Sequence, residues 1–100
     1  MLVAVLVADL YIPDALSLKD KRRRIARLIE QIRAKYPVSV AEVGFQDLHR
    51  RGRIGLALVT TDARMARSML DRITDLVGRD GEVEMTDRTI EIFRMDGEEP

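Results

Sequence analysis

The amino-acid sequence predicts an α+β fold in which two helices cover one face of a four-stranded antiparallel sheet. Two stretches with helical periodicity, at 18–35 and 62–78, each lie between two stretches that alternate as strands do. The two middle strands follow one another with only a short loop between them. Two strand–helix–strand units with right-handed crossovers, joined in this way, form the ferredoxin-like βαββαβ sandwich. The other face of its sheet is left without helices.

The first strand is predicted over residues 2–12, where valines, and then Asp9 and Tyr11, alternate between two faces with leucines, alanines and an isoleucine. Asp9 and Tyr11 are its polar pair, so they indicate the face that points away from the helices. The face toward the helices then carries Leu6, Ala8 and Leu10. The open face carries Val3, Val5 and Val7.

The first helix is predicted over residues 18–35. Ser17, followed three residues later by Asp20, resembles a capping box and marks the start of the helix. Its apolar residues fall on one arc at about 100° per residue, as expected for an amphipathic helix. Pro37 ends it.

The second half of the fold begins with strands at 38–44 and 53–61, and the latter adds Ala57 and Val59 to the open face. The last strand slips once in its alternation, which favours a bulge near residues 86–88 over a short hairpin.

The second helix is expected to begin after Asp62 as its N-cap, with Gly78 as the residue just past its end. On its surface, Arg67 and Asp71 have the spacing of a local ion pair. We therefore expect its outer face to be nearly neutral.

Length and composition indicate one globular domain. A chain of 100 residues, 46% apolar and 34% charged, suffices for a single core. We expect this domain to span residues 1–96, followed by a short acidic tail at 97–100. The longest apolar run, residues 1–8, is too short to cross a membrane, and no basic region precedes it, so a cytoplasmic protein is expected. The sequence has no cysteine, which agrees with a reducing compartment.

The formal net charge of zero hides an uneven distribution along the chain. Residues 1–53 contain eleven Lys and Arg against six Asp and Glu, whereas residues 54–100 contain six against eleven. Such asymmetry can produce a basic binding face, although it disappears where the two halves interleave in the fold.

A basic cluster, KDKRRRIAR at 19–27, opens the first helix. The positive end of the helix dipole disfavours cations there, so the cluster favours an anionic partner. The candidate contacts on the outer face are Lys19, Arg23, Arg24 and Arg27, with Lys21 and Arg22 at the rim. Lys21 itself projects into the apolar arc. Either its ammonium reaches solvent past the end of the helix, or it meets a ligand at the edge of the sheet.

The loop FQDLHRRG at 45–52 lies between the two middle strands, and basic residues at its end and just after it add three candidate anion contacts, Arg50, Arg51 and Arg53. It also holds His49, the single histidine, close to Asp47. Because no nucleophile or metal ligand lies at a known spacing from it, His49 is interpreted as a solvated loop residue rather than an acid/base group. No catalytic residue, metal site or cofactor is expected.

Four segments of the sequence are distinctive as a set: Ile-Pro at 12–13, SLKDKR at 17–22, VSVAEVG at 38–44 and Asp-Leu at 47–48. With these segments the chain resembles the YlxP-like family of small uncharacterised bacterial proteins over nearly its whole length. The resemblance implies a ferredoxin-like fold and a cytoplasmic protein, often encoded near translation-initiation and ribosome-maturation factors, but no established activity. Relatives often carry a tryptophan or a similar large residue after Asp-Leu, where this chain has His49.

Two functions fit these observations. The first is an RNA- or ribosome-associated binding protein that contacts phosphates with the basic helix and the Arg-rich loop. Its sheet lacks the aromatic side chains on which bases stack in RRM domains, so recognition by shape and charge is expected. An enzyme is disfavoured, because the chain has no glycine-rich phosphate loop and no metal-ligand cluster.

The alternative is a homodimeric interaction or scaffold module that binds no nucleic acid. An exposed apolar stripe on the open sheet face motivates it, because monomers seldom leave such a patch uncovered. The expected interface residues are Val3, Val5, Val7, Ala57 and Val59. Neither hypothesis involves a membrane or a metal.

Overall fold

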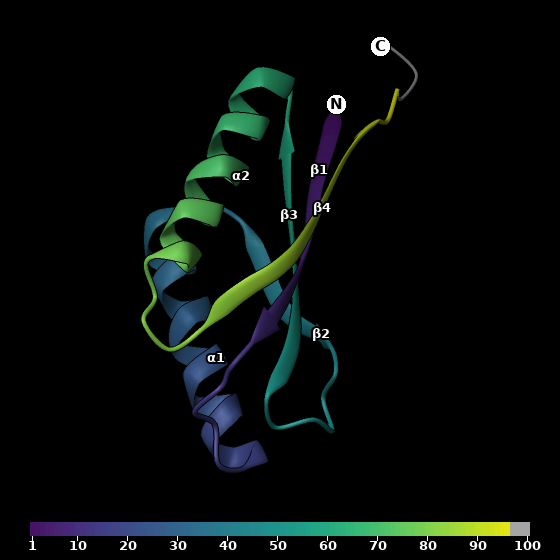
Figure 1. Ribbon diagram of the computed structural model, residues 1–100. Helices are drawn as coiled ribbons and strands as arrows, with labels where there is room; N and C mark the ends of the chain where they lie inside the picture. Colours follow the sequence, from purple (N-terminus) through teal and green to yellow (C-terminus); the bar gives the residue numbers. More distant parts are fainter. Residues whose placement is uncertain (97–100) are drawn as a thin grey trace.

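The structure, a computed structural model, describes residues 1–96 and has the predicted order of elements (Figure 1). In chain order they are β1 (Leu2–Tyr11), α1 (Leu18–Lys35), β2 (Ser39–Gly44), β3 (Arg51–Thr60), α2 (Ala63–Gly78) and β4 (Glu84–Arg94). The ferredoxin-like fold class is thereby confirmed. The acidic tail predicted at 97–100 lies outside the described residues.

The four strands form one sheet in the order β2-β3-β1-β4, and each neighbouring pair is antiparallel. β1 is central and pairs along its whole length with β3, from Leu2 opposite Thr60 to Tyr11 opposite Arg51. Both helices lie on the same side of the sheet, as Figure 1 shows. The second side is therefore open, as the sequence predicts.

The core lies between the helices and one face of the sheet, and it follows the alternation of the strands. In β1 the even-numbered residues from Leu2 to Leu10 are buried, whereas the valines between them are partly or largely exposed. The core side chains of the other main elements are Ile54, Leu56 and Leu58 of β3, Ile25, Leu28 and Ile32 of α1, and Leu70, Ile73 and Val77 of α2. The predicted assignment of residues to the two faces of β1 is thus confirmed.

The helix starts are capped as predicted. The Ser17 hydroxyl accepts a hydrogen bond from the Asp20 amide at 3.0 Å, and the Asp20 carboxylate reaches back to accept from the Leu16 amide at 3.2 Å. Asp62 caps α2 in the same way, because its Oδ1 accepts from the Met65 amide at 3.1 Å.

The predicted end of α2 is wrong by one residue. Gly78 is the last helical residue, and Arg79 forms the cap in a right-handed conformation with φ of −89°. Its amide donates to the carbonyls of both Asp75 and Leu76, at 3.1 and 3.2 Å. Because this tightened last turn satisfies the terminal carbonyls, no left-handed glycine is needed after the helix.

The predicted ion pair between Arg67 and Asp71 is also wrong. Asp71 instead accepts from Arg88 of β4 at 3.0 Å, and Arg88 also donates to the Thr74 hydroxyl at 2.8 Å. Asp71 thus ties α2 to the neighbouring strand rather than to its own helix.

The bulge predicted near residues 86–88 is present. Asp9 lies opposite Asp87 but the next residue, Leu10, lies opposite Met85, so Thr86 is the extra residue in β4. A second irregularity, which the sequence analysis did not predict, lies between Glu42 and Gly44 of β2.

Close packing between α1 and β3 depends on Gly52, which is buried beneath Ile25. A Cβ atom at residue 52 would lie 2.6 Å from Ile25 Cδ1, closer than nonbonded carbons approach. We expect Gly52→Ala to lower the free energy of unfolding by about 1–3 kcal/mol, as overpacking does. Urea denaturation measures this, with Gly81→Ala as the control, because a Cβ at residue 81 meets nothing within 4 Å. Equal effects of the two substitutions would contradict the packing argument.

Candidate functional site

The side chain of Lys21 connects the first turn of α1 to the loop between β2 and β3. It is fully buried, and its ammonium donates to the backbone carbonyls of Phe45 at 2.8 Å, Arg51 at 3.1 Å and Gln46 at 3.5 Å. The Glu42 carboxylate lies 3.7 Å from the same nitrogen. These contacts satisfy a charge that would otherwise be costly to bury. We call this arrangement the Lys21 clasp.

Neither interpretation of Lys21 from the sequence is correct. The side chain does not reach solvent, because its exposed fraction is 0%. It is also not available to a ligand, because its ammonium is occupied by the loop carbonyls and Glu42. Lys21 is therefore removed from the candidate anion contacts and becomes a structural residue.

The clasp brings the two basic segments of the sequence together at one end of the molecule. Figure 1 shows the start of α1 and the β2–β3 loop at the same end. The Ile12 amide, just after β1, donates to the Arg50 carbonyl at 2.8 Å and fixes the loop from its other side. The Arg-rich loop and the basic helix start thus meet at one end of the molecule.

Phe45 opens this loop in a left-handed conformation, with φ of +57°. A non-glycine residue adopts this conformation at a cost, so its surroundings must hold it there. The guanidinium groups of Arg51 and Arg53 lie 4.2 and 4.6 Å from the centre of its ring, within cation–π distance. The Phe45 carbonyl is in turn bound by Lys21.

Arg53 also binds Asp9 across the neighbouring strand. Its Nε and Nη2 donate to the two carboxylate oxygens at 2.6 and 3.2 Å. This hydrogen bonding holds the pKa of Asp9 below its ordinary value and raises the pKa of Arg53. Arg53, a predicted anion contact, is therefore occupied by an internal carboxylate.

The outer face of α1 is partly neutralised, because two carboxylates pair with three of its four predicted cations. Asp20 accepts from Arg23 at 2.8 Å and from Arg24 at 3.2 Å. Glu82, from the turn before β4, pairs with Arg27 and lies 3.8 Å from Arg24. The bond from Arg24 lowers the pKa of Asp20, and the bond from Arg27 lowers the pKa of Glu82.

Four of the predicted cations remain exposed without a carboxylate partner among residues 1–96: Lys19, Arg22, Arg50 and Arg51. Lys19 and Arg22 come from α1, Arg50 from the loop and Arg51 from the start of β3, so the Lys21 clasp holds all four at the same end of the molecule. We call these four residues the free basic set.

His49 is exposed in the loop, and no side-chain hydrogen bond to it occurs within the part of the chain that the structure describes. Within residues 1–96, no group of three His, Cys, Asp or Glu side chains is arranged to hold a metal ion. Neither α1 nor α2 has the length and apolar character needed to cross a bilayer.

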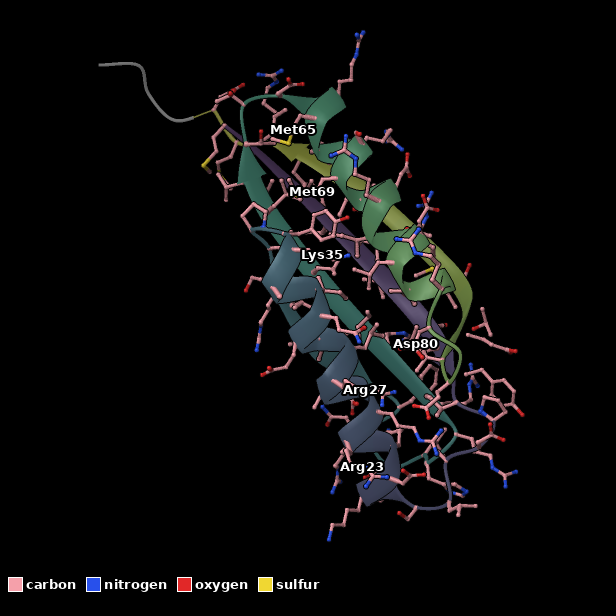
Figure 2. The ribbon with its side chains drawn as sticks, turned by 90° about the vertical axis from the view of Figure 1, so that its left-hand side faces the viewer. Arg23, Arg27, Lys35, Met65, Met69 and Asp80 are labelled. Atoms are coloured by element: carbon pink, nitrogen blue, oxygen red, sulfur yellow. The ribbon has the colours of Figure 1, made fainter. Side chains whose placement is uncertain are left out.

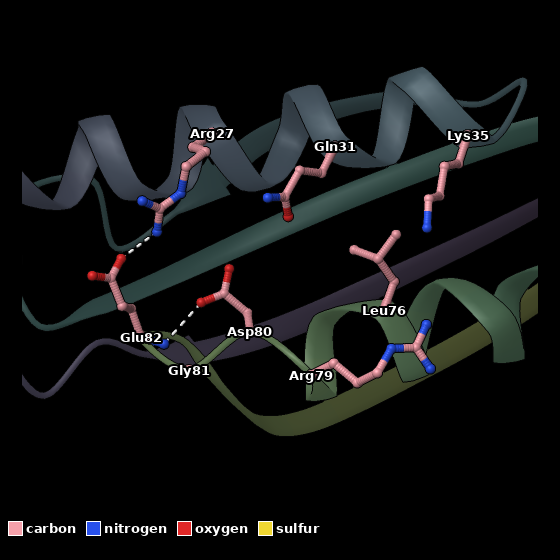
Figure 3. Close-up of a pocket in the computed structure, with 8 residues that line it drawn as sticks. All are labelled: Arg27, Gln31, Lys35, Leu76, Arg79, Asp80, Gly81 and Glu82. Atoms are coloured by element: carbon pink, nitrogen blue, oxygen red, sulfur yellow. Dashed lines mark hydrogen bonds and ion pairs between the residues drawn. The ribbon is translucent and has the colours of Figure 1, made fainter.

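A groove of about 580 Å³ lies between α1 and the turn that follows α2 (Figure 3). The Arg27–Glu82 pair closes one end, and Lys35 lies toward the other end, beside Leu76 (Figure 3). Asp80 points into the turn, where it accepts from the Glu82 amide at 2.8 Å. Figure 2 shows how Arg23 and Arg27 follow one another along α1, with Asp80 facing them from the turn. This groove could not be predicted from the sequence, because its walls come from residues 27–35 and 76–82, which are 41 to 55 positions apart.

The open sheet face carries the residues predicted for a dimer interface. Val3 and Val5 of β1 and Ala57 of β3 are partly exposed, whereas Val7 and Val59 are 38% and 65% exposed. The structure adds Phe93 of β4, which lies opposite Val3 and is 50% exposed. The sequence analysis missed Phe93, because the bulge at Thr86 had to be placed before the faces of β4 could be assigned.

A hollow of about 320 Å³ lies on the same open face above Gly55. Valine and alanine side chains of β1, β2 and β3 surround it: Val5, Val7, Ala41, Val43 and Ala57. Because Gly55 has no side chain, Val43 leans over it, with its two γ carbons 3.3 and 3.4 Å from where a Cβ of residue 55 would lie, and the hollow lies beside Val43.

The sequence matches a known protein family. A family described as "Protein of unknown function (DUF503)" matches residues 3–90. The chain belongs to this family. It is 32% identical over 80 residues to the "Uncharacterized protein YlxP" of Bacillus subtilis (strain 168), which covers 80% of this chain and 87% of YlxP. The predicted resemblance to YlxP-like proteins is thus confirmed.

A solved structure supports the fold alone. A de novo designed protein with a ferredoxin fold, LFR1 1, matches 100% of this chain and 92% of its own, with a TM-score of 0.51. The sequence identity is 16%, so this likeness extends to the architecture and no further.

The Lys21 clasp predicts a large difference between two lysines of the same helix. Lys21→Met leaves three loop carbonyls and Glu42 without their cation, and we expect it to lower the free energy of unfolding by about 3 kcal/mol. Lys19→Met, two residues away and exposed, should change it by no more than about 0.5 kcal/mol. Urea denaturation of both variants measures the difference. A Lys21→Met protein as stable as the Lys19→Met protein would contradict the clasp.

Acid stability follows from the lowered pKa values of Asp9, Asp20 and Glu82. A carboxylate whose pKa is lower in the folded state stabilises that state above its unfolded pKa of about 4, and this contribution is lost as the pH falls further. We therefore expect the free energy of unfolding to decrease below about pH 4. Asp20→Asn should make this decrease shallower than in wild type, whereas Asp47→Asn, in the exposed loop, should not. Denaturation from pH 2 to 7 tests both.

Proposed function

We propose that this protein binds RNA, free or within a ribosomal particle, at the end of the molecule where the start of α1 meets the β2–β3 loop. The observation that carries the proposal is the Lys21 clasp, which fixes the helix start against the loop. The free basic set is thereby held at one end of the molecule rather than on two independent segments. A prearranged group of cations loses less conformational entropy when it binds an anion.

The chemistry of these side chains suits RNA. Three of the four are arginines, whose forked guanidinium groups bind phosphate oxygens in pairs. Arg51 has a further property, because its guanidinium is already positioned over the Phe45 ring. Arginine side chains also stack on unpaired bases, which are the parts of RNA that proteins reach most readily. We therefore propose a single-stranded or loop segment of RNA as the ligand.

The remaining predicted contacts are not part of this proposal. Arg24, Arg27 and Arg53 would each have to leave an internal carboxylate before they could bind phosphate. Arg23 is 79% exposed but also bonded to Asp20. The proposed contact surface is thus smaller than the one predicted from the sequence.

Salt dependence provides the test. Four phosphate contacts should make log affinity for a single-stranded RNA fall with log salt at a slope of roughly −3, from about −0.7 per contact. The double variant Arg22→Gln/Arg50→Gln removes two of them, so its slope should be roughly −1.4. Neither side chain bonds to another residue within 1–96, so the fold should be unchanged. Fluorescence anisotropy with labelled RNA measures both slopes.

The matched control is Arg64→Gln/Arg67→Gln. These two exposed arginines lie on α2, which begins at the opposite end of the molecule, as the positions of Met65 and Arg23 in Figure 2 show. The control removes the same total charge, yet its slope should equal that of wild type. If both double variants made the slope equally shallow, the RNA would be attracted by total positive charge rather than by the free basic set. No binding by wild type at about 50 mM salt, where phosphate contacts are strongest, would reject the proposal.

A further inference from the structure

We infer that the open sheet face binds a second copy of this chain, with Phe93 of each copy seated in the hollow above Gly55 of the other. This inference does not depend on RNA binding, because neither Phe93 nor any residue around the hollow belongs to the free basic set. It adds to the predicted interface residues a projecting side chain, Phe93, and a recess that can receive it.

The projecting side chain is Phe93. An aromatic ring that is half exposed on a sheet edge, next to Val3 of the central strand, is costly to leave in water. Val59, on the other side of the same β1 residue, is 65% exposed and continues the apolar surface. Monomeric proteins seldom expose continuous apolar surface of this kind without a partner.

The recess is the hollow of about 320 Å³ above Gly55. An apolar cavity of about 150 Å³ already accommodates a benzene molecule, so a phenyl ring fits here. Its walls are aliphatic side chains, among them Val5, Val7 and Val43. Such walls suit an aromatic ring and offer nothing to a phosphate.

The positions of ring and recess point to a second copy rather than to a different protein. Phe93 lies on β4 opposite Val3, and Gly55 lies on β3 opposite Val7. The two are therefore on opposite sides of β1, and Val5 lies midway between them. We place a two-fold axis between the two copies, passing over Val5 at right angles to the line from ring to recess. Rotation about this axis places the ring of each copy over the recess of the other. This is what a closed dimer interface requires, since one surface must complement itself.

The charged residues on this face lie among and beside its apolar side chains. Arg53 and Asp9 neutralise one another at one end, and β4 adds two acids, Asp87 opposite Asp9 and Glu91 opposite Val5. Acidic residues there disfavour nucleic acid. With the axis over Val5, the strands of the two copies cross steeply, as in orthogonal sheet packing.

The experiment uses sedimentation velocity over a range of concentrations. Wild type is expected to dimerise. Phe93→Ala removes the ring and Gly55→Val fills the recess, so each variant loses both symmetry-related contacts, and we expect each to weaken dimerisation by at least about a hundredfold, or about tenfold per contact. Thr89→Ala, on the same face of β4 but opposite Val7, is the matched control and should dimerise as wild type does. Urea denaturation first establishes that each variant is folded.

Mixing the two weakened variants is the decisive step. A mixed dimer has one intact contact, because the Phe93 of the Gly55→Val copy meets the open recess of the Phe93→Ala copy. Labelled Gly55→Val protein should therefore associate with unlabelled Phe93→Ala protein about tenfold more tightly than either variant associates with itself. Failure of the mixture to gain affinity would overturn the ring-in-recess contact. A wild-type monomer at every concentration, or a dimer that Val5→Glu leaves intact, would overturn the interface as a whole.

Discussion

The buried ammonium of Lys21 is the interaction on which one end of this molecule depends. A charge without water is tolerated only where dipoles and a counter-charge replace its hydration shell, and here the loop carbonyls and Glu42 do so. The loop cannot move away from α1 without leaving that charge unsatisfied. An element with no regular structure thereby acquires a defined conformation, including the left-handed Phe45.

The second constraint is the pairing of arginines from the first half of the chain with acids from both halves. Glu82 crosses the molecule to meet Arg24 and Arg27, whereas Asp20 binds arginines of its own helix. Much of the charge asymmetry along the sequence is therefore cancelled in space. What remains positive is a small group of side chains with a fixed arrangement, and a surface of this kind favours recognition by position over attraction by total charge.

The sequence was sufficient for elements whose signal is local. The bounds of α1, the two faces of β1 and the bulge in β4 all follow from periodicity and capping within a few residues. The site was less predictable because its partners are distant, as Lys21 binds carbonyls 24 to 30 residues away and Arg27 meets an acid 55 residues away. A lysine on an apolar arc was the one visible sign that this charge would be buried.

The bulge at Thr86 also affects whether β4 can pair with an edge strand of another copy of this protein. β4 is an edge strand of 11 residues, and a long regular edge would offer its free backbone groups to the edge of another molecule. The extra residue breaks that regularity, and Asp87 and Arg88 beside it add charges that resist strand pairing. The irregular, charged part of β4 is therefore a poor template for pairing with an edge strand of another molecule.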